Sequence, residues 1–203
     1  MTKIKFVYFD VGNVFHTYEN IFKTPADHFG IHPDDIGDIF DKYESEISIG
    51  KMTANDLWQK CCVELNLPNA TNFDFARSWA NDYTVIPSMY KLTERIADKY
   101  KTGILSNHYI GTFEEGLKQN KIPNINYSSV IVSAEVGYKK PQLEIFQIAE
   151  EKSGHHGSEI LFIDDQQKNL DAAAKIGWQT FLYDHSHSDK SSQDLAKFLG
   201  LAS

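Results

Sequence analysis

Two kinds of hydrophobic pattern divide this chain. From about residue 86 onward, short runs of apolar residues alternate with stretches in which apolar residues recur every three or four positions. The short runs predict buried strands, and the wider spacing predicts helices with one buried face. Strands are expected at residues 102–106, 129–133, 159–163 and 178–183, and a first strand at residues 5–9.

Residues 17–85 carry only the helical pattern. One helix is expected over residues 33–49, where apolar side chains recur at helical spacing. Thr53 and Asp56 resemble a capping box at the start of a second helix, and a third helical stretch surrounds Trp79. Because no strand pattern appears between residues 15 and 86, we expect an all-helical insert.

Alternating strands and helices are typical of a parallel sheet with helices on both faces. We therefore expect an α/β fold with a Rossmann-like, three-layer core made of residues 1–16 and 86–203. The small helical domain, residues 17–85, is inserted after the first strand. In the core, helices are expected around Leu92 and Ile96, around Phe113 and Leu117, from Pro141 to Gly154, from Leu170 to Gly177, and over residues 195–199.

Composition narrows the class of protein. The net charge of −8 and the absence of a basic run disfavour nucleic acid as a partner. No apolar run approaches the roughly 18–20 residues of a membrane span, and no signal peptide is expected. Cys61 and Cys62 are adjacent, so we interpret them as reduced thiols of a cytoplasmic protein. The segment 184–189 is interpreted as a solvated loop rather than a metal site.

Polar residues follow four of the predicted strands. Asp10 ends the first strand, Ser106 and Asn107 end the second, and Asp164 and Asp165 follow the fourth. Lys140 comes after the third strand, directly before Pro141. Parallel strands bring these ends to one edge of the sheet, where ligands bind in open α/β folds.

Three carboxylates gathered in one place repel each other unless a cation holds them together. Because only oxygen ligands are available, Mg²⁺ suits such a site and zinc does not. An ammonium group and a hydroxyl beside a magnesium site are typical of a receptor for a phosphoryl group. The strand ends therefore predict a Mg²⁺ and phosphate site.

Taken in order, these motifs resemble the haloacid dehalogenase (HAD) superfamily over essentially the whole chain. The first motif is the strand followed by Asp10, the second is Ser106, the third is Lys140 before a proline, and the fourth is the Asp164–Asp165 pair. The later pattern of Asn169, Ala173 and Gly177 is also similar to this family. The helical insert matches the cap domain of one branch.

The resemblance implies a Mg²⁺-dependent phosphatase in which Asp10 attacks phosphorus and forms an aspartyl-phosphate. It implies that Asp10, the carbonyl of Gly12, and Asp165 hold Mg²⁺, with Asp164 bound directly or through a neighbour. Phosphate would be held by Ser106, by the backbone amide of Asn107 and by Lys140, which also assists catalysis. The cap would choose a small phosphorylated metabolite.

One residue departs from the family pattern. Most phosphatases of this family carry a second Asp two positions after the nucleophile as the general acid and base, whereas this chain has Gly12. The Asp-x-Gly-Asn-Val motif resembles a branch that includes phosphatases for sugar phosphates such as glucose 1-phosphate. His16 and Tyr18 are candidate proton donors, with simple packing or exposure as the alternative. Gly50 to Thr53 and Trp58 are candidates for substrate contact, with core packing or a helix turn as the alternative.

Three functions fit the sequence to different degrees. The leading one is phosphatase activity on a sugar phosphate. A dehalogenase would use Asp10 to attack carbon and needs no metal, which leaves the Asp164–Asp165 pair without a role. A non-catalytic binding protein would have kept the fold and lost the general acid at position 12.

Overall fold

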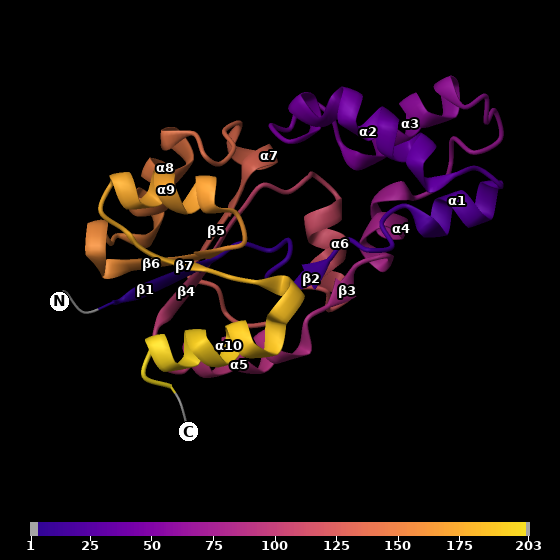
Figure 1. Cartoon of the computed structure of the whole chain (residues 1–203). Coiled ribbons are helices and arrows are strands. Elements are labelled where there is room, and N and C mark those ends of the chain that lie inside the picture. The colour runs from indigo at the N-terminus through magenta and orange to yellow at the C-terminus, as the bar shows by residue number, and fades with distance from the viewer. Residues whose placement is uncertain (1–3, 202–203) are drawn as a thin grey trace.

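Five parallel strands form the central sheet of the computed structural model, which describes residues 4–201 (Figure 1). The strand order is β5-β4-β1-β6-β7, so β1 lies in the middle. The predicted parallel α/β core is therefore confirmed. The strands span Phe6–Phe9 (β1), Lys101–Ser106 (β4), Ser129–Val132 (β5), Ile160–Asp164 (β6) and Gln179–Leu182 (β7).

Helices cover both faces of this sheet, as the alternating side chains of a strand require. In β1, Val7 and Phe9 pack on the side of α5 (Pro87–Ala97) and α10 (Ser188–Phe198). Phe6 and Tyr8 pack on the opposite side, against α8 (Leu143–Ser153) and α9 (Gln167–Lys175). Figure 1 shows these two helix pairs on either side of the sheet.

Four helices between residues 23 and 81 form what we call the helical region, which has a hydrophobic cluster of its own. They are α1 (Lys23–Phe29), α2 (Pro33–Ile47), α3 (Ala54–Glu64) and α4 (Phe75–Asn81). The predicted capping box is present, since Thr53 and Asp56 bond each other at the start of α3. Cys61 and Cys62 are free, buried thiols. In Figure 1 the helical region lies beside the carboxyl ends of the core strands.

The segments that connect the helical region to the core contain two short strands. β2 (His16–Thr17) pairs antiparallel with β3 (Thr84–Val85), and α6 (Thr112–Lys118) lies next to them in Figure 1. The expectation that no strand occurs between residues 15 and 86 was therefore wrong. A two-residue strand is too short to show alternation, so the sequence carries no signal for it.

Other local expectations also need correction. Pro141 does not open α8, which begins at Leu143. The segment 184–189 contains a short 3₁₀ helix, η2 (His185–His187), and the start of α10 rather than only a loop. The sequence pattern also missed α1, α7 (Ser133–Val136) and the 3₁₀ helix η1 (Gly157–Glu159).

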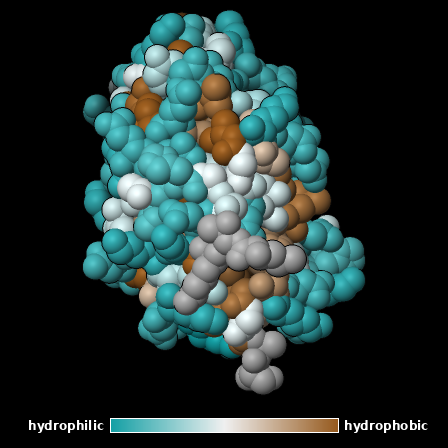
Figure 2. Space-filling view, turned by 90° about the vertical axis from the view of Figure 1, so that its left-hand side faces the viewer, coloured by the Kyte–Doolittle hydropathy of each residue, from teal (hydrophilic) through white to brown (hydrophobic). Residues whose placement is uncertain are grey.

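Within residues 4–201, none of the helices combines the length and the apolar character needed to cross a membrane. The face seen in Figure 2 is mostly hydrophilic, and hydrophobic residues appear there in small separate patches.

Candidate active site

The side chains predicted to meet at one sheet edge do so at the end of β1. The connections after β1 lead to β4 and β5 on one side, and the chain then returns to β6 and β7 on the other. This reversal of direction leaves a crevice outside the carboxyl end of β1. Asp10 lies there, and Ser106, Lys140, Asp164 and Asp165 surround it.

Asp10 is held by bonds to only one of its oxygens. Oδ1 accepts hydrogen bonds from the backbone N–H of Val11 and from Ser106 Oγ, both at 2.7 Å, and lies 3.0 Å from Lys140 Nζ. No residue in the range 4–201 bonds to Oδ2. Burial raises the pKa of Asp10 to about 7, and Lys140 opposes this shift. A cation beside Asp10 would lower this pKa again.

Lys140 is a buried cation between two carboxylates. Its Nζ lies 2.6 Å from Asp164 Oδ2, and the lysine is only 2 % exposed. Burial alone would lower the pKa of Lys140, but Asp10 and Asp164 raise it above its usual value, so the ammonium stays charged. Asn107 fixes the lysine backbone, because its side chain accepts from Lys140 N–H at 2.7 Å and donates to Lys140 O at 3.0 Å.

The two aspartates after β6 have different partners. Both oxygens of Asp164 are engaged: Asn169 Nδ2 donates to each of them, Gln166 N–H donates to Oδ1, and Lys140 donates to Oδ2. Asp165 accepts one bond at Oδ2, from Asn13 Nδ2 at 2.9 Å. Its Oδ1 is buried without a partner among the described residues. Asp165 therefore has the free ligand atom that Asp164 lacks.

These carboxylates fit a divalent cation. One oxygen each from Asp10, Asp164 and Asp165 lie within 4.8 Å of one another, and this is the only such cluster of potential ligands in residues 4–201. The donor atoms are all oxygens, which suits Mg²⁺. A buried carboxylate oxygen without a partner is costly, and a cation would remove this cost at Asp165 Oδ1.

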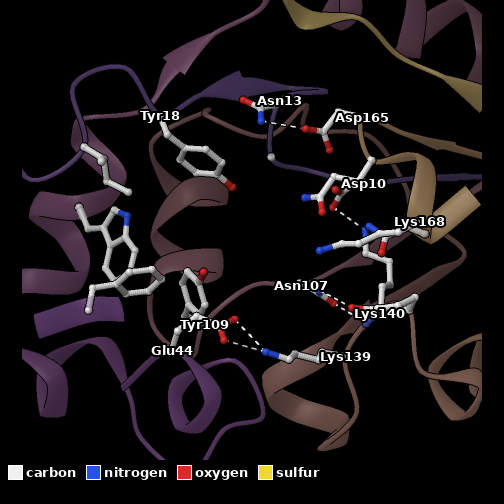
Figure 3. A pocket seen from close by; sticks show the side chains of 17 residues that line it. Asp10, Asn13, Tyr18, Glu44, Asn107, Tyr109, Lys139, Lys140, Asp165 and Lys168 are labelled. Carbon is white, nitrogen blue, oxygen red and sulfur yellow. Dashed lines mark hydrogen bonds and ion pairs between the residues drawn. The ribbon is translucent and has the colours of Figure 1, made fainter. Parts of the chain in front are cut away.

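A cavity of about 430 Å³ opens beside the carboxylates and reaches the helical region. Figure 3 shows Asp10, Asp165 and Lys140 on one side and Tyr18 and Tyr109 on the other. The wall nearer the helical region is mostly aromatic or aliphatic, with Tyr18, Ile21, Phe40, Trp79 and Tyr109. The cavity can therefore hold a charged group at one end and a less polar group at the other.

An ion pair joins the helical region to the core at this cavity. Lys139 Nζ lies 2.8 Å from a carboxylate oxygen of Glu44, in α2, and both side chains are partly exposed. Two adjacent lysines thus have different partners, because Lys140 is buried among the aspartates. The structure thus places Lys140, and not Lys139, beside Asp10 and Asp164.

Several residues considered from sequence lie away from the cavity. Trp58 is buried in the helical region, where its Nε1 donates to Ala70 O, and Gly50 packs against the backbone of Ala134. Neither lines the cavity, so packing is the better explanation for both. His16 is buried too, and its Nδ1 lies 3.1 Å from Lys121 O.

Other site residues had no clear sequence signal. Asn13 adopts a positive φ of 55° in the turn after β1 and donates to Asp165. The left-handed conformation in this turn is therefore found at Asn13 and not at Gly12. Glu44 and Phe40 lie one helical turn apart on α2, but helical spacing alone does not show which of them reaches a cavity.

Comparison with known proteins identifies similar families and folds. A sequence model of the family described as "Haloacid dehalogenase-like hydrolase" matches residues 28–183. The matched range contains Ser106, Lys140, Asp164 and Asp165, whereas Asp10 precedes it. A search of curated proteins finds no match.

Solved structures with the same fold include enzymes of two kinds. A HAD family enzyme from Bacteroides thetaiotaomicron, solved with magnesium and inorganic phosphate, is 19% identical with a TM-score of 0.76, over 91% of this chain and 96% of that one. A predicted HAD-like family hydrolase from Porphyromonas gingivalis is 18% identical with a TM-score of 0.72, over 92% and 94%. An L-2-haloacid dehalogenase from Xanthobacter autotrophicus with covalently bound chloropropionic acid is 17% identical with a TM-score of 0.68, over 97% and 84%. At these identities the likeness shows the fold.

Proposed function

We propose that this chain, which belongs to the haloacid dehalogenase-like hydrolase family, is a Mg²⁺-dependent phosphatase for a small phosphorylated metabolite. The observation that carries the proposal is the arrangement around Asp10. A buried lysine and a serine hydroxyl hold one oxygen of this carboxylate, and Asp165 beside it has a buried oxygen without a partner. This arrangement supports a site that binds a cation and a phosphoryl group together.

Mg²⁺ would be held by Asp10, Asp165 and the backbone carbonyl of Gly12. Within the cluster of three aspartates, Asp10 Oδ2 and Asp165 Oδ1 are the oxygens to which none of residues 4–201 bonds. Asp164 would not bind Mg²⁺ directly but would position its hydrogen-bond partners, because both of its oxygens already accept hydrogen bonds from Asn169. When bound, the cation supplies positive charge that offsets the repulsion between phosphate and carboxylate.

The residues around Asp10 then divide the work of phosphoryl transfer. The carboxylate of Asp10 attacks phosphorus, the bond to the leaving oxygen breaks, and water later hydrolyses the aspartyl-phosphate. Lys140 neutralises charge on Asp10 and on the phosphoryl oxygens, while Asn107 keeps the lysine backbone in place. Ser106, which bonds Asp10 in this structure, would donate to a phosphoryl oxygen when substrate is present.

The leaving group would occupy the aromatic end of the cavity. We propose that residues 17–85 act as a cap over the core formed by residues 1–16 and 86–203, and that the cap selects the substrate. A volume of about 430 Å³ accommodates a hexose phosphate. The C–H face of a sugar packs on aromatic rings, and Glu44 can accept hydrogen bonds from hydroxyl groups, which supports a sugar phosphate.

Carbon–halogen hydrolysis is the main alternative, because solved dehalogenases share this fold. That reaction would also use Asp10 as the nucleophile but requires no cation. It would leave the buried, unpartnered oxygen of Asp165 without a function. The arrangement of Asp165 therefore favours the phosphatase over the dehalogenase.

A substrate panel tests the proposal. Phosphate release is measured from hexose 1-phosphates, hexose 6-phosphates and aryl phosphates, and halide release from L-2-chloropropionate, each with Mg²⁺ and with chelator. We expect phosphate release that requires Mg²⁺ and no halide release. Halide release in chelator would instead indicate a dehalogenase, and no release of either ion would indicate a non-catalytic protein.

A further inference from the structure

The side-chain space at position 12 is already occupied. Gly12 does not have a positive φ, so its backbone conformation is open to other residues. A Cβ atom added there would lie 2.1 Å from Tyr18 Oη and 2.8 Å from Tyr18 Cζ. The phenol therefore fills the volume into which a side chain at position 12 would extend. An aspartate at this position would require Tyr18 to move.

Tyr18 is held in this position by its ring and has a free hydroxyl. It lies in the connection between β2 and α1, and its ring packs edge-on against His16 and Tyr83 at centroid distances of 5.3 Å and 5.6 Å. Nothing in the described part of the chain hydrogen-bonds to its Oη, and Tyr18 lines the cavity. Figure 3 shows the hydroxyl pointing toward Asp10 and Asp165.

We propose that Tyr18 takes the place of the side chain absent at position 12 and donates a hydrogen bond to the oxygen that links phosphorus to the leaving group. This inference rests on the phosphatase function proposed above. As Asp10 bonds to phosphorus and the bond to this oxygen breaks, negative charge grows on the oxygen. The hydrogen bond from Tyr18 stabilises that charge, and the leaving group takes its final proton from water.

His16 does not suit this role. Its ring stacks on Tyr83 at a centroid distance of 3.8 Å, and its Nδ1 contacts the carbonyl of Lys121. It is fully buried and does not line the cavity. A phenol, by contrast, is protonated at neutral pH and needs no further group to make it a donor. Of the two donors that the sequence offers near position 12, Tyr18 is therefore the one with access to substrate.

The test compares Tyr18→Phe with wild type and with Tyr90→Phe. Tyr90→Phe is a matched control, because it removes a hydroxyl that donates to Asn120 O, and Tyr90 does not line the cavity. Single-turnover rates are measured with Mg²⁺ for a series of aryl phosphates of graded leaving-group acidity. We expect Tyr18→Phe to slow the poorest leaving groups about 10- to 100-fold and the best ones about twofold or less. Tyr90→Phe should leave the series unchanged.

A second variant keeps the test decisive if Tyr18→Phe folds poorly. Tyr18→Ala removes the whole ring and opens the space beside Gly12, so Asp can fit there in the double variant Gly12→Asp/Tyr18→Ala. The double variant should recover the rates of poor leaving groups relative to Tyr18→Ala alone. Gly12→Asp alone should not show this gain, because its side chain meets Tyr18.

Three results would overturn the inference. If Tyr18→Phe slows all leaving groups equally, the tyrosine only shapes the site, and if it slows none, the hydroxyl has no part in the reaction. Equal rates in Tyr18→Ala and the double variant would also contradict an exchange between the two positions. In each case wild-type turnover would still support the phosphatase. The absence of Mg²⁺-dependent turnover in wild type would instead overturn the proposed function together with this inference.

Discussion

Asp10 at the end of β1 and His16 in β2 are two buried ionisable residues with opposite surroundings. Asp10 lies among charged groups, 3.0 Å from Lys140 Nζ and close to Asp164 and Asp165. His16 lies among rings, stacked on Tyr83, and its Nε2 has no hydrogen-bond partner in the described chain. Burial raises the pKa of Asp10 to about 7 and lowers the pKa of His16 to about 4.

The difference between these surroundings shows where this fold can hold buried charged side chains. At the sheet edge, a buried cation and hydrogen-bond donors compensate the carboxylates, so ionised groups can be kept away from water. At the junction between the core and the helical region, the rings of His16 and His108 pack against aromatic rings, and His16 Nδ1 also contacts the carbonyl of Lys121. Burial lowers the pKa of His108 to about 3, so both histidines stay neutral. The region around Asp10 therefore holds charged side chains, whereas the region around His16 holds neutral, packed ones.

The largest expected effect comes from replacing Asp10, the proposed nucleophile. Asp10→Asn keeps the size of the side chain but removes the negative charge that attacks phosphorus. Turnover should fall by at least about 10³-fold, while the melting temperature stays close to that of wild type. Phosphate release and thermal unfolding are measured on the same preparation. A variant that keeps more than a tenth of wild-type activity contradicts the covalent mechanism.

Two adjacent lysines give the next test. Lys140→Met leaves Asp10 and Asp164 buried without their cation, so we expect a loss of about 3–5 kcal/mol in the free energy of unfolding. Lys139→Met breaks the partly exposed pair with Glu44 and should cost about 1 kcal/mol or less. Denaturant unfolding measures both variants. Equal losses in the free energy of unfolding would show that the buried Lys140 stabilises the fold no more than the partly exposed Lys139 does.

Lowering the pH should change the contributions of His16 and Asp10 to the free energy of unfolding in opposite directions in the metal-free protein. The folded-state pKa of His16 is depressed, so between pH 6.5 and pH 4 the unfolded chain binds more protons at this residue than the folded chain does. The contribution of His16 to the free energy of unfolding therefore falls by about 3 kcal/mol over this range. The folded-state pKa of Asp10 is raised, so the folded chain binds more protons at this residue than the unfolded chain does. The contribution of Asp10 to the free energy of unfolding therefore grows as pH falls and shrinks as pH rises toward 7.

The measurement is the free energy of unfolding at a series of pH values in chelator. The stability advantage of wild type over His16→Gln should shrink as pH falls from 6.5 to 4. The advantage over Asp10→Asn should grow over the same range. His156→Gln, which changes a surface histidine, serves as the control. Slopes of the same sign for the His16 and Asp10 variants would contradict the contrast between the two regions.

The smallest expected effect is the change in Mg²⁺ affinity when residues at the proposed cation site are replaced. Asp165→Ala removes the free oxygen of the site, and Asn169→Ala removes only a donor that positions Asp164. We expect Asp165→Ala to weaken Mg²⁺ binding by at least about tenfold, and by more than Asn169→Ala does. Titration calorimetry with Mg²⁺ measures both. Unchanged affinity in Asp165→Ala would exclude this residue as a ligand.

The hydrophobic pattern of the sequence was enough to predict which side chains meet around Asp10. The strand ends at Asp10, Ser106 and Asp164 meet because parallel topology alone brings them to one edge. Hydrophobic runs long enough to show a period also gave the main helices and strands. The two-residue strands β2 and β3 and the four-residue helix α7 are too short to show alternation or a helical period, and they were missed.

The opposite wall of the cavity could not be predicted in this way. Which side chains of the helical region reach the site depends on how its helices pack, and periodicity does not fix that packing. Trp58 was therefore a reasonable guess that lies in the interior, whereas Glu44 and Trp79 line the cavity. The filling of the space at Gly12 by Tyr18 is also a tertiary contact, so it became visible only in the structure.

The most direct test of the central claim is to trap the phosphorylated enzyme. Wild-type protein with Mg²⁺ is mixed with a substrate that it cleaves, quenched in acid within one turnover, digested and analysed by mass spectrometry. We predict a phosphoryl group on the peptide that contains Asp10, and none on this peptide in Asp10→Asn or without Mg²⁺. Rapid phosphate release with an unmodified Asp10 peptide at every quench time would contradict nucleophilic attack by Asp10.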